Sequence, residues 1–131
     1  MSGENVEIVR AGFDAVNRGD VDAAFKDIAP DAEFDQSRAV GFDRGVYNVD
    51  QWRRLLEEFS QAWESVRFEA DEFIDAGDHV VTPFTNRFLG RDGVEVQARG
   101  TWVWTIREGA VVRVCLYQER QEALEAAGLR E

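Results

Sequence analysis

Five residues near the C-terminus, Trp102, Trp104, Arg113, Tyr117 and Glu119, combine aromatic side chains with groups that could take part in acid–base chemistry. A carboxyl group held among aromatic side chains has its charged form disfavoured, so Glu119 could act as a general acid or base. Arg113 could bind a carboxylate or stabilise an enolate oxygen, and Tyr117 could donate a hydrogen bond to a carbonyl. Trp102 and Trp104 are suited to lining an apolar small-molecule pocket.

Two alternating segments, 100–106 and 111–117, carry most of these residues, and a short glycine-containing turn joins them. This pattern is typical of a β-hairpin. If the hairpin closes with Arg107 opposite Ala110, the residues of one sheet face meet in three cross-strand pairs: Trp104 with Arg113, Trp102 with Cys115, and Gly100 with Tyr117. We therefore expect one face to hold both indoles, the phenol and the guanidinium, with Glu119 just beyond it.

Each of these polar side chains also has a purely structural interpretation. Glu119 could stabilise the start of a terminal helix through the helix dipole. Arg113 could stack on Trp104 as a cation, which contributes about 0.5–2 kcal/mol. Tyr117 could pack with its hydroxyl at the rim of the cavity. Catalytic and structural roles therefore stay open for this group.

Asp35 is a further candidate acid or base, and it follows Phe34 on a short predicted strand at 32–36. Because neighbouring side chains of a strand point to opposite faces, a buried Phe34 turns Asp35 away from the same core. A catalytic Asp35 therefore requires a twist or a bulge, and a capping or turn role is the alternative.

Four more residues could line a ligand pocket, from a loop, a helix and a strand: Tyr47, Trp52, Trp63 and Asn86. Trp52 and Trp63 lie on one side of the third predicted helix, where core packing is the alternative. Asn86 adjoins Arg87, and one of the two must face inward. Pro83 leaves the choice undetermined, because a proline in a strand is expected at a sheet edge or a bulge.

The elements that position these residues are helices first and strands after. Helical spacing of apolar residues predicts helices over 5–17, 21–29 and 51–63, with Asp20 and Asp50 as caps and Pro30 as the stop of the second. Alternation predicts strands over 66–73, 79–89, 94–106 and 111–118, followed by a short helix over 119–127. This order predicts a single α+β domain over residues 1–131, with helices packed on one face of a curved antiparallel sheet around a cone-shaped cavity.

Composition narrows the classes of partner. The 131 residues carry a formal net charge of −11, which argues against binding to nucleic acid or an anionic membrane surface. We also find no apolar run long enough to span a bilayer and no signal peptide, so a cytoplasmic location is expected. With one His and one Cys we expect no metal site, and no glycine-rich phosphate loop or other cofactor motif is evident.

Five segments give the chain a family resemblance: NRGD (Asn17–Asp20), APDAEFD (Ala29–Asp35), RGVYNVDQWRRLLEEF (Arg44–Phe59), DEFIDAGD (Asp71–Asp78) and WTIREGAVVRV (Trp104–Val114). Together they resemble the SnoaL-like branch of the NTF2-like superfamily, which includes ketosteroid isomerase, scytalone dehydratase, limonene-epoxide hydrolase and the polyketide cyclases. The resemblance covers residues 5–129. It implies a cone of three helices on a strongly bent antiparallel sheet, often in a homodimer.

The resemblance bears on the site residue by residue. It places Glu119 at the acid/base aspartate of the polyketide cyclases, and Asp35 near the early-strand carboxylate of ketosteroid isomerases. Trp102 stands where many members have a histidine, and Phe13 stands where the isomerases have a tyrosine.

Two functions follow as hypotheses. The first is a cofactor-free isomerase, dehydratase or cyclase acting on an apolar or aromatic metabolite. The second is a non-catalytic module that binds such a metabolite or assembles as a dimer.

Overall fold

A computed structural model describes residues 2–39 and 44–129 of the chain. Its helices are α1 (Ser2–Asn17), α2 (Val21–Ala24), α3 (Val49–Ala62) and α4 (Arg120–Ala126). Its strands are β1 (Ile28–Asp35), β2 (Val46–Tyr47), β3 (Ser65–Ala70), β4 (Ile74–Ala76), β5 (His79–Leu89), β6 (Glu95–Arg107) and β7 (Ala110–Tyr117). The predicted α+β fold is confirmed.

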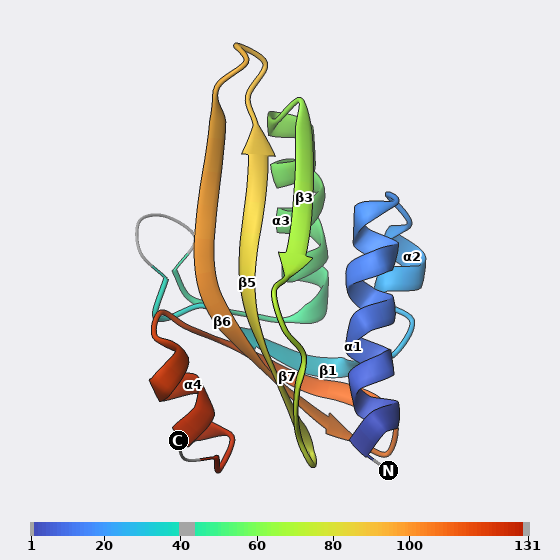
Figure 1. The fold of residues 1–131 in the computed structure, drawn as a ribbon. Coiled ribbons are helices and arrows are strands. Elements are labelled where there is room, and N and C mark those ends of the chain that lie inside the picture. The colour runs from blue at the N-terminus through green and yellow to red at the C-terminus, as the bar shows by residue number, and fades with distance from the viewer. Residues whose placement is uncertain (1, 40–43, 130–131) are drawn as a thin grey trace.

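One curved, unclosed sheet organises the domain, with strand order β2-β1-β7-β6-β5-β3 and β4 also paired with β5. All the strand pairs are antiparallel except β1 with β7, which is parallel. Helix α3 lies behind the sheet and α4 on the opposite side (Figure 1). Within the described residues, no helix is long and apolar enough to cross a bilayer.

Local signals explain where the helices begin and end. The Asp20 side chain accepts a hydrogen bond from the amide of Ala23, as the predicted cap requires. The third helix begins earlier than predicted, because Asn48 and Gln51 form a capping box, with each side chain bonded to the other residue's amide. Helix α2 is shorter than predicted, since the chain turns into β1 at Ile28.

Two prolines behave differently from their predicted roles. Pro30 does not stop a helix but lies exposed in β1, where the pairing with β7 is irregular. Pro83 lies in β5, which is an interior strand whose register with β6 is continuous, so neither the predicted edge nor a bulge in this pairing is present. Instead, Pro83 lies where the neighbour of β5 changes from β3 to β4, a gap that tolerates the missing amide donor.

The β6–β7 hairpin contains a bulge that the alternating pattern did not reveal. Arg107 pairs with Ala110 as predicted, and Glu108 and Gly109 adopt positive φ at the turn. The register then shifts between the pairs Ile106–Val111 and Thr105–Arg113, which leaves Val112 as the extra residue of β7. Beyond the bulge every pairing differs by one residue from the prediction.

Candidate functional site

The most prominent hollow of the described structure lies between α3 and the sheet. It has a volume of about 570 Å³. Its walls come from α3, from β3, β5, β6 and β7, and from the segment after β1. Its lining is dominated by aromatic and aliphatic side chains: Trp52, Leu55, Leu56, Phe59, Trp63, Phe68, Phe84, Phe88, Val96, Trp102 and Leu116. We call this hollow the larger cavity.

Stacked aromatic rings build one end of the larger cavity. Trp52 stacks on Phe34 at 5.1 Å between ring centroids and meets Trp102 edge to face at 5.9 Å. Trp102 in turn stacks on Phe84 at 5.5 Å. Such offset and edge-to-face contacts fix the rings relative to one another. The predicted lining positions of Trp52 and Trp102 are therefore part of an ordered wall.

A second aromatic group forms the opposite end, where α3 stops. Phe88 meets Phe59 edge to face at 4.7 Å and lies 5.4 Å from Trp63. Phe68 on β3 approaches the same Phe88 ring. Aromatic rings thus line both of these parts of the larger cavity, an arrangement that suits a flat apolar guest.

Asn86 is the buried polar residue of this lining. Phe84, Asn86 and Phe88 are alternate residues of β5 and all line the larger cavity, whereas Arg87 is exposed. Asn86 is 7% exposed. Its Oδ1 atom is buried and accepts no hydrogen bond from any described residue. The uncertainty left by Pro83 is resolved in favour of Asn86 on the cavity side.

A smaller cavity of about 170 Å³ lies between the sheet and the helices α1 and α2. Trp104 lines it, with 5.9 Å between the centroids of its ring and the Phe13 ring. Its indole N–H donates a hydrogen bond to the Thr82 hydroxyl at 2.9 Å. Trp52 and Trp102 line both cavities and, together with Leu56 and Phe68, form the wall between them. Of the two tryptophans of β6, Trp102 therefore borders both cavities, whereas Trp104 is among the lining residues of the smaller one alone.

Tyr47 takes a position behind this wall. Its hydroxyl donates to the carbonyl of Arg44 at 3.0 Å, and its ring lies 6.1 Å from Trp52. Tyr47 is not among the lining residues of either cavity. It supports Trp52 rather than closing over the larger cavity.

The predicted shared face of tryptophans and polar groups is not formed. Because of the bulge at Val112, Trp104 lies opposite Val114 and Trp102 opposite Leu116. A shift of one residue moves a strand's side chains to the other face. Arg113 and Tyr117 therefore lie on the face opposite the tryptophans, and the prediction that they surround one pocket is wrong.

Asp35 joins Arg113 on that opposite face. Its carboxylate accepts hydrogen bonds from the Ser37 amide at 2.9 Å, the Ser37 hydroxyl at 2.6 Å and Arg113 Nη2 at 2.9 Å. Arg38 lies 3.8 Å away and stacks over the Tyr117 ring. The alternation argument that turns Asp35 away from Phe34 is confirmed, since Phe34 is buried in the core against Val114.

Electrostatics favour a structural role for this group. Burial would raise the pKa of Asp35, but the hydrogen bonds from Ser37 and the charges of Arg113 and Arg38 outweigh burial and hold that pKa below its usual range. Burial raises the pKa of the Cys115 thiol and of the Tyr117 phenol. The carboxylate is therefore fixed in its charged form, and the thiol and the phenol in their neutral forms.

Comparison with known proteins gives the family. A model of the SnoaL-like domain matches residues 9–114. The chain belongs to the SnoaL-like family. A search of curated proteins found no match.

Solved structures with the same fold are numerous, and three illustrate them. An NTF2-like protein from Burkholderia thailandensis is 25% identical, with 94% of this chain and 95% of that chain covered and a TM-score of 0.74. TerC, co-crystallized with polyporic acid, is 20% identical, with 95% and 98% covered and a TM-score of 0.75. A protein of ketosteroid isomerase-like fold from Catenulispora acidiphila, in complex with trimethylamine, is 18% identical, with 94% and 93% covered and a TM-score of 0.71.

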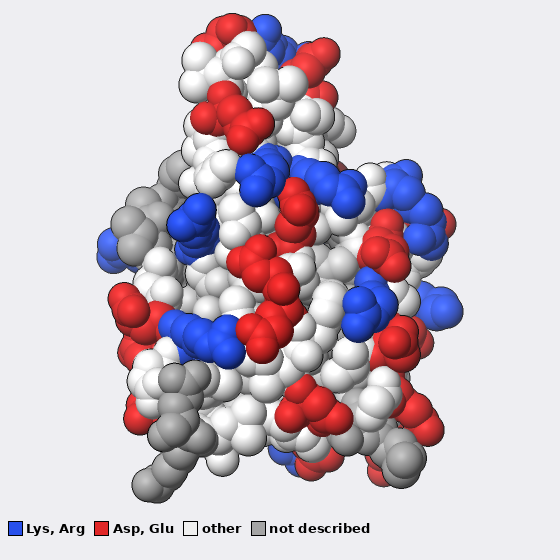
Figure 2. All heavy atoms as spheres, in the orientation of Figure 1, with Lys and Arg blue, Asp and Glu red and all other residues white. Residues whose placement is uncertain are grey.

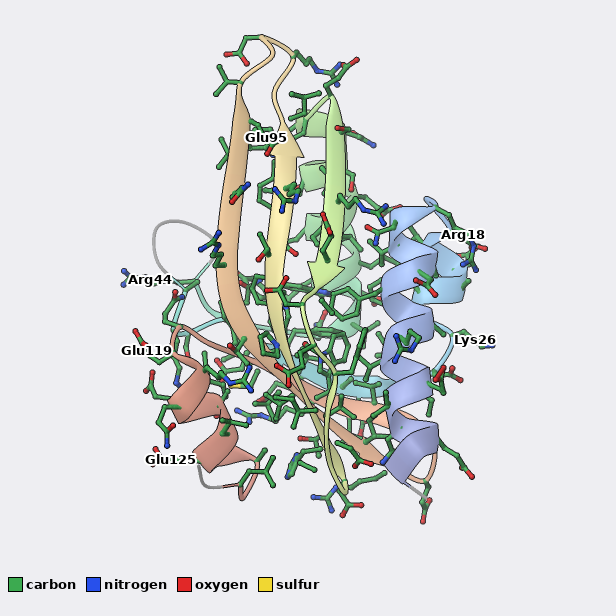
Figure 3. All side chains as sticks on the ribbon, viewed as in Figure 1. Arg18, Lys26, Arg44, Glu95, Glu119 and Glu125 are labelled. Carbon is green, nitrogen blue, oxygen red and sulfur yellow. The ribbon has the colours of Figure 1, made fainter. Side chains whose placement is uncertain are left out.

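Glu119, which the resemblance placed at an acid/base position, lies outside both cavities of this SnoaL-like protein. It is the residue before α4, it is exposed, and its side chain makes no capping hydrogen bond. Figure 3 shows it pointing outward at the start of α4, and this helix packs on the sheet face opposite α3. Within residues 2–39 and 44–129, no three His, Cys, Asp or Glu side chains group in a way that could hold a metal ion.

Phe84 and Phe88 line the larger cavity, and the sequence analysis did not single them out. They stand two positions before and after Asn86, and that spacing is the signal that could have identified them. The sequence also contains a signal of the bulge, since Val114 and Leu116 suit the apolar face of the tryptophans better than Arg113 does.

Proposed function

We propose that this SnoaL-like protein binds a flat, apolar or aromatic small molecule in the larger cavity. The observation that carries the proposal is the lining itself, in which seven aromatic rings from α3, its C-terminal cap and the sheet enclose about 570 Å³. Binding sites for small molecules are concave and mostly apolar, with few polar groups that fix orientation. TerC, co-crystallized with polyporic acid, and the structure holding trimethylamine support a fold that accepts small organic molecules.

Binding is favoured over proton-transfer catalysis by the polar groups of the lining. Gln36, Asn86, Arg99 and Gln118 are the polar members of the described lining, which includes no Asp, Glu, His, Lys, Cys or Tyr. A general acid or base must lie within hydrogen-bond reach of the proton it moves. Asp35 and Glu119 do not meet that requirement for a guest of the larger cavity.

A cavity-filling substitution tests the proposal. Ala98 lines the larger cavity opposite Asn86 on the neighbouring strand, so Ala98→Phe would occupy the space of a guest. We expect isothermal titration calorimetry to show that wild-type protein binds 2-naphthol and that Ala98→Phe weakens binding at least about tenfold, a change of about 1.4 kcal/mol.

The matched control is Gln97→Phe, one residue away on the same strand and on the exposed side. It adds the same ring outside the cavity and should leave 2-naphthol binding unchanged. Circular dichroism should show the same secondary structure in all three proteins. Equal binding by wild type and a folded Ala98→Phe would place the guest elsewhere and contradict the proposal.

A further inference from the structure

We propose that Asn86 selects the guest of the larger cavity, and that the guest is a neutral aromatic molecule carrying a hydroxyl group. This inference rests on the proposed function and names the class of ligand for the same site. The observation behind it is the Asn86 side chain, which lines the larger cavity while its Oδ1 is covered and lacks a hydrogen-bond donor among the described residues, so a guest reaches this oxygen when the amide turns about its Cβ–Cγ bond.

The surroundings of Asn86 are apolar on every side that the sheet defines. Its cross-strand partners are Phe68 on β3 and Ala98 on β6, and Phe84 and Phe88 precede and follow it on the same face of β5. None of these four side chains carries a hydrogen-bonding group. A leucine at position 86 would suit this wall better for folding alone, because a buried unpaired amide oxygen is destabilising.

Other buried or half-buried polar groups in the same part of the fold have partners. Thr82 lies four residues before Asn86 on β5, and its hydroxyl accepts a hydrogen bond from the Trp104 indole N–H. Asn17 pairs through both ends of its amide with the backbone of Phe68, at 2.7 and 2.8 Å. The Thr85 hydroxyl donates to Asp71 at 3.0 Å. Asn86 Oδ1 differs from these groups, which points to a partner that arrives with the ligand.

A hydroxyl group is the complement that fits a side-chain amide. Its O–H can donate to Oδ1, and its oxygen can accept from the Nδ2 amino group. A carboxylate lacks the donor that Oδ1 requires, although Arg99 in the same lining could pair with its charge. An ether keeps the ring and the acceptor but loses the donor. Ligand recognition should therefore depend on the O–H bond itself.

The test compares two probes of the same shape, 2-naphthol and 2-methoxynaphthalene, by isothermal titration calorimetry. We expect wild-type protein to bind 2-naphthol about tenfold more tightly than the ether. Asn86→Leu should lose this preference by weakening 2-naphthol binding while keeping that of the ether. Gln118→Leu removes an exposed amide of the same lining and should keep the preference.

Thermal denaturation gives an independent readout, because the melting temperature of Asn86→Leu should at least equal that of the wild type. A preference that survives in Asn86→Leu, or equal binding of both probes by the wild type, overturns the inference and leaves the proposed function intact. Failure of the wild type to bind either probe overturns the proposed function and the inference together.

Discussion

Asp35 illustrates at the residue scale how a carboxylate can be buried and still charged. It is 7% exposed, yet two groups of Ser37 and the guanidinium of Arg113 donate to it. Hydrogen bonds to the charged form and nearby positive charges oppose the effect of burial. The residue therefore joins the segment after β1 to β7 as a structural link.

The lowered pKa of Asp35 predicts a specific loss of stability in acid. Because the folded pKa lies below the unfolded value of about 3.9, Asp35 stabilises the fold above that pH and loses its contribution as pH falls through the folded pKa. Asp35→Asn should lower the free energy of unfolding at pH 7 by about 1–3 kcal/mol. Urea titrations between pH 7 and 3 should show a smaller decrease in this variant than in the wild type.

The control for Asp35 is Glu33→Gln, which removes an exposed carboxylate that contacts the same Arg113 at 3.2 Å. An exposed ion pair contributes little, so its loss should cost less than about 1 kcal/mol at pH 7. If Glu33→Gln and Asp35→Asn had equal effects at every pH, burial of Asp35 would not be the cause.

At the scale of the elements, sequence patterns predict the fold where a pattern has one physical interpretation. Asp20 before an apolar helix, Glu108–Gly109 between two alternating strands, and the alternation of β5 and β6 all lead to the observed structure. The bulge in β7 was not predictable in this way, because Val111 and Val112 suit either face equally well. One unpaired residue then exchanged the faces of Arg113, Cys115 and Tyr117.

Deleting Val112 should reveal how strongly the bulge is specified. The deletion would impose the register in which Arg113 faces Trp104, so the guanidinium would leave Asp35 for an apolar wall. We expect a loss of at least about 3 kcal/mol in the free energy of unfolding, or no cooperative unfolding at all. The measurement is chemical denaturation followed by circular dichroism.

Val112→Ala is the matched control, since it shortens the same side chain without changing the register. It should cost about 1 kcal/mol. A Val112 deletion that unfolds at the same denaturant concentration as this control would show that the sheet accepts either register.

At the scale of the whole molecule, the residues predicted to share one pocket are divided between the two faces of the sheet. The tryptophans and Asn86 lie on the cavity side, whereas Asp35, Arg113, Tyr117 and Glu119 lie outside the cavities. Figure 2 shows acidic and basic side chains interspersed on the visible face, with no continuous basic stripe there. The prediction that nucleic acid is not a partner and the cytoplasmic location remain predictions.

The homodimer implied by the family resemblance also remains a prediction. Sedimentation equilibrium at micromolar concentration should give a mass twice that of one chain. The free energy that holds two copies together would add to the stability of each, so the melting temperature should rise with protein concentration. A single-chain mass across the accessible concentrations would contradict the dimer.

The wall that Trp52 and Trp102 form between the two cavities has an optical consequence. Of the four tryptophans in the chain, Trp52, Trp63 and Trp102 border the larger cavity, while Trp104 borders the smaller one with its N–H bonded to Thr82. A guest in the larger cavity would change the emission of the first three indoles, so the total tryptophan fluorescence would report its binding. The protein thus carries its own occupancy reporter, without any added dye.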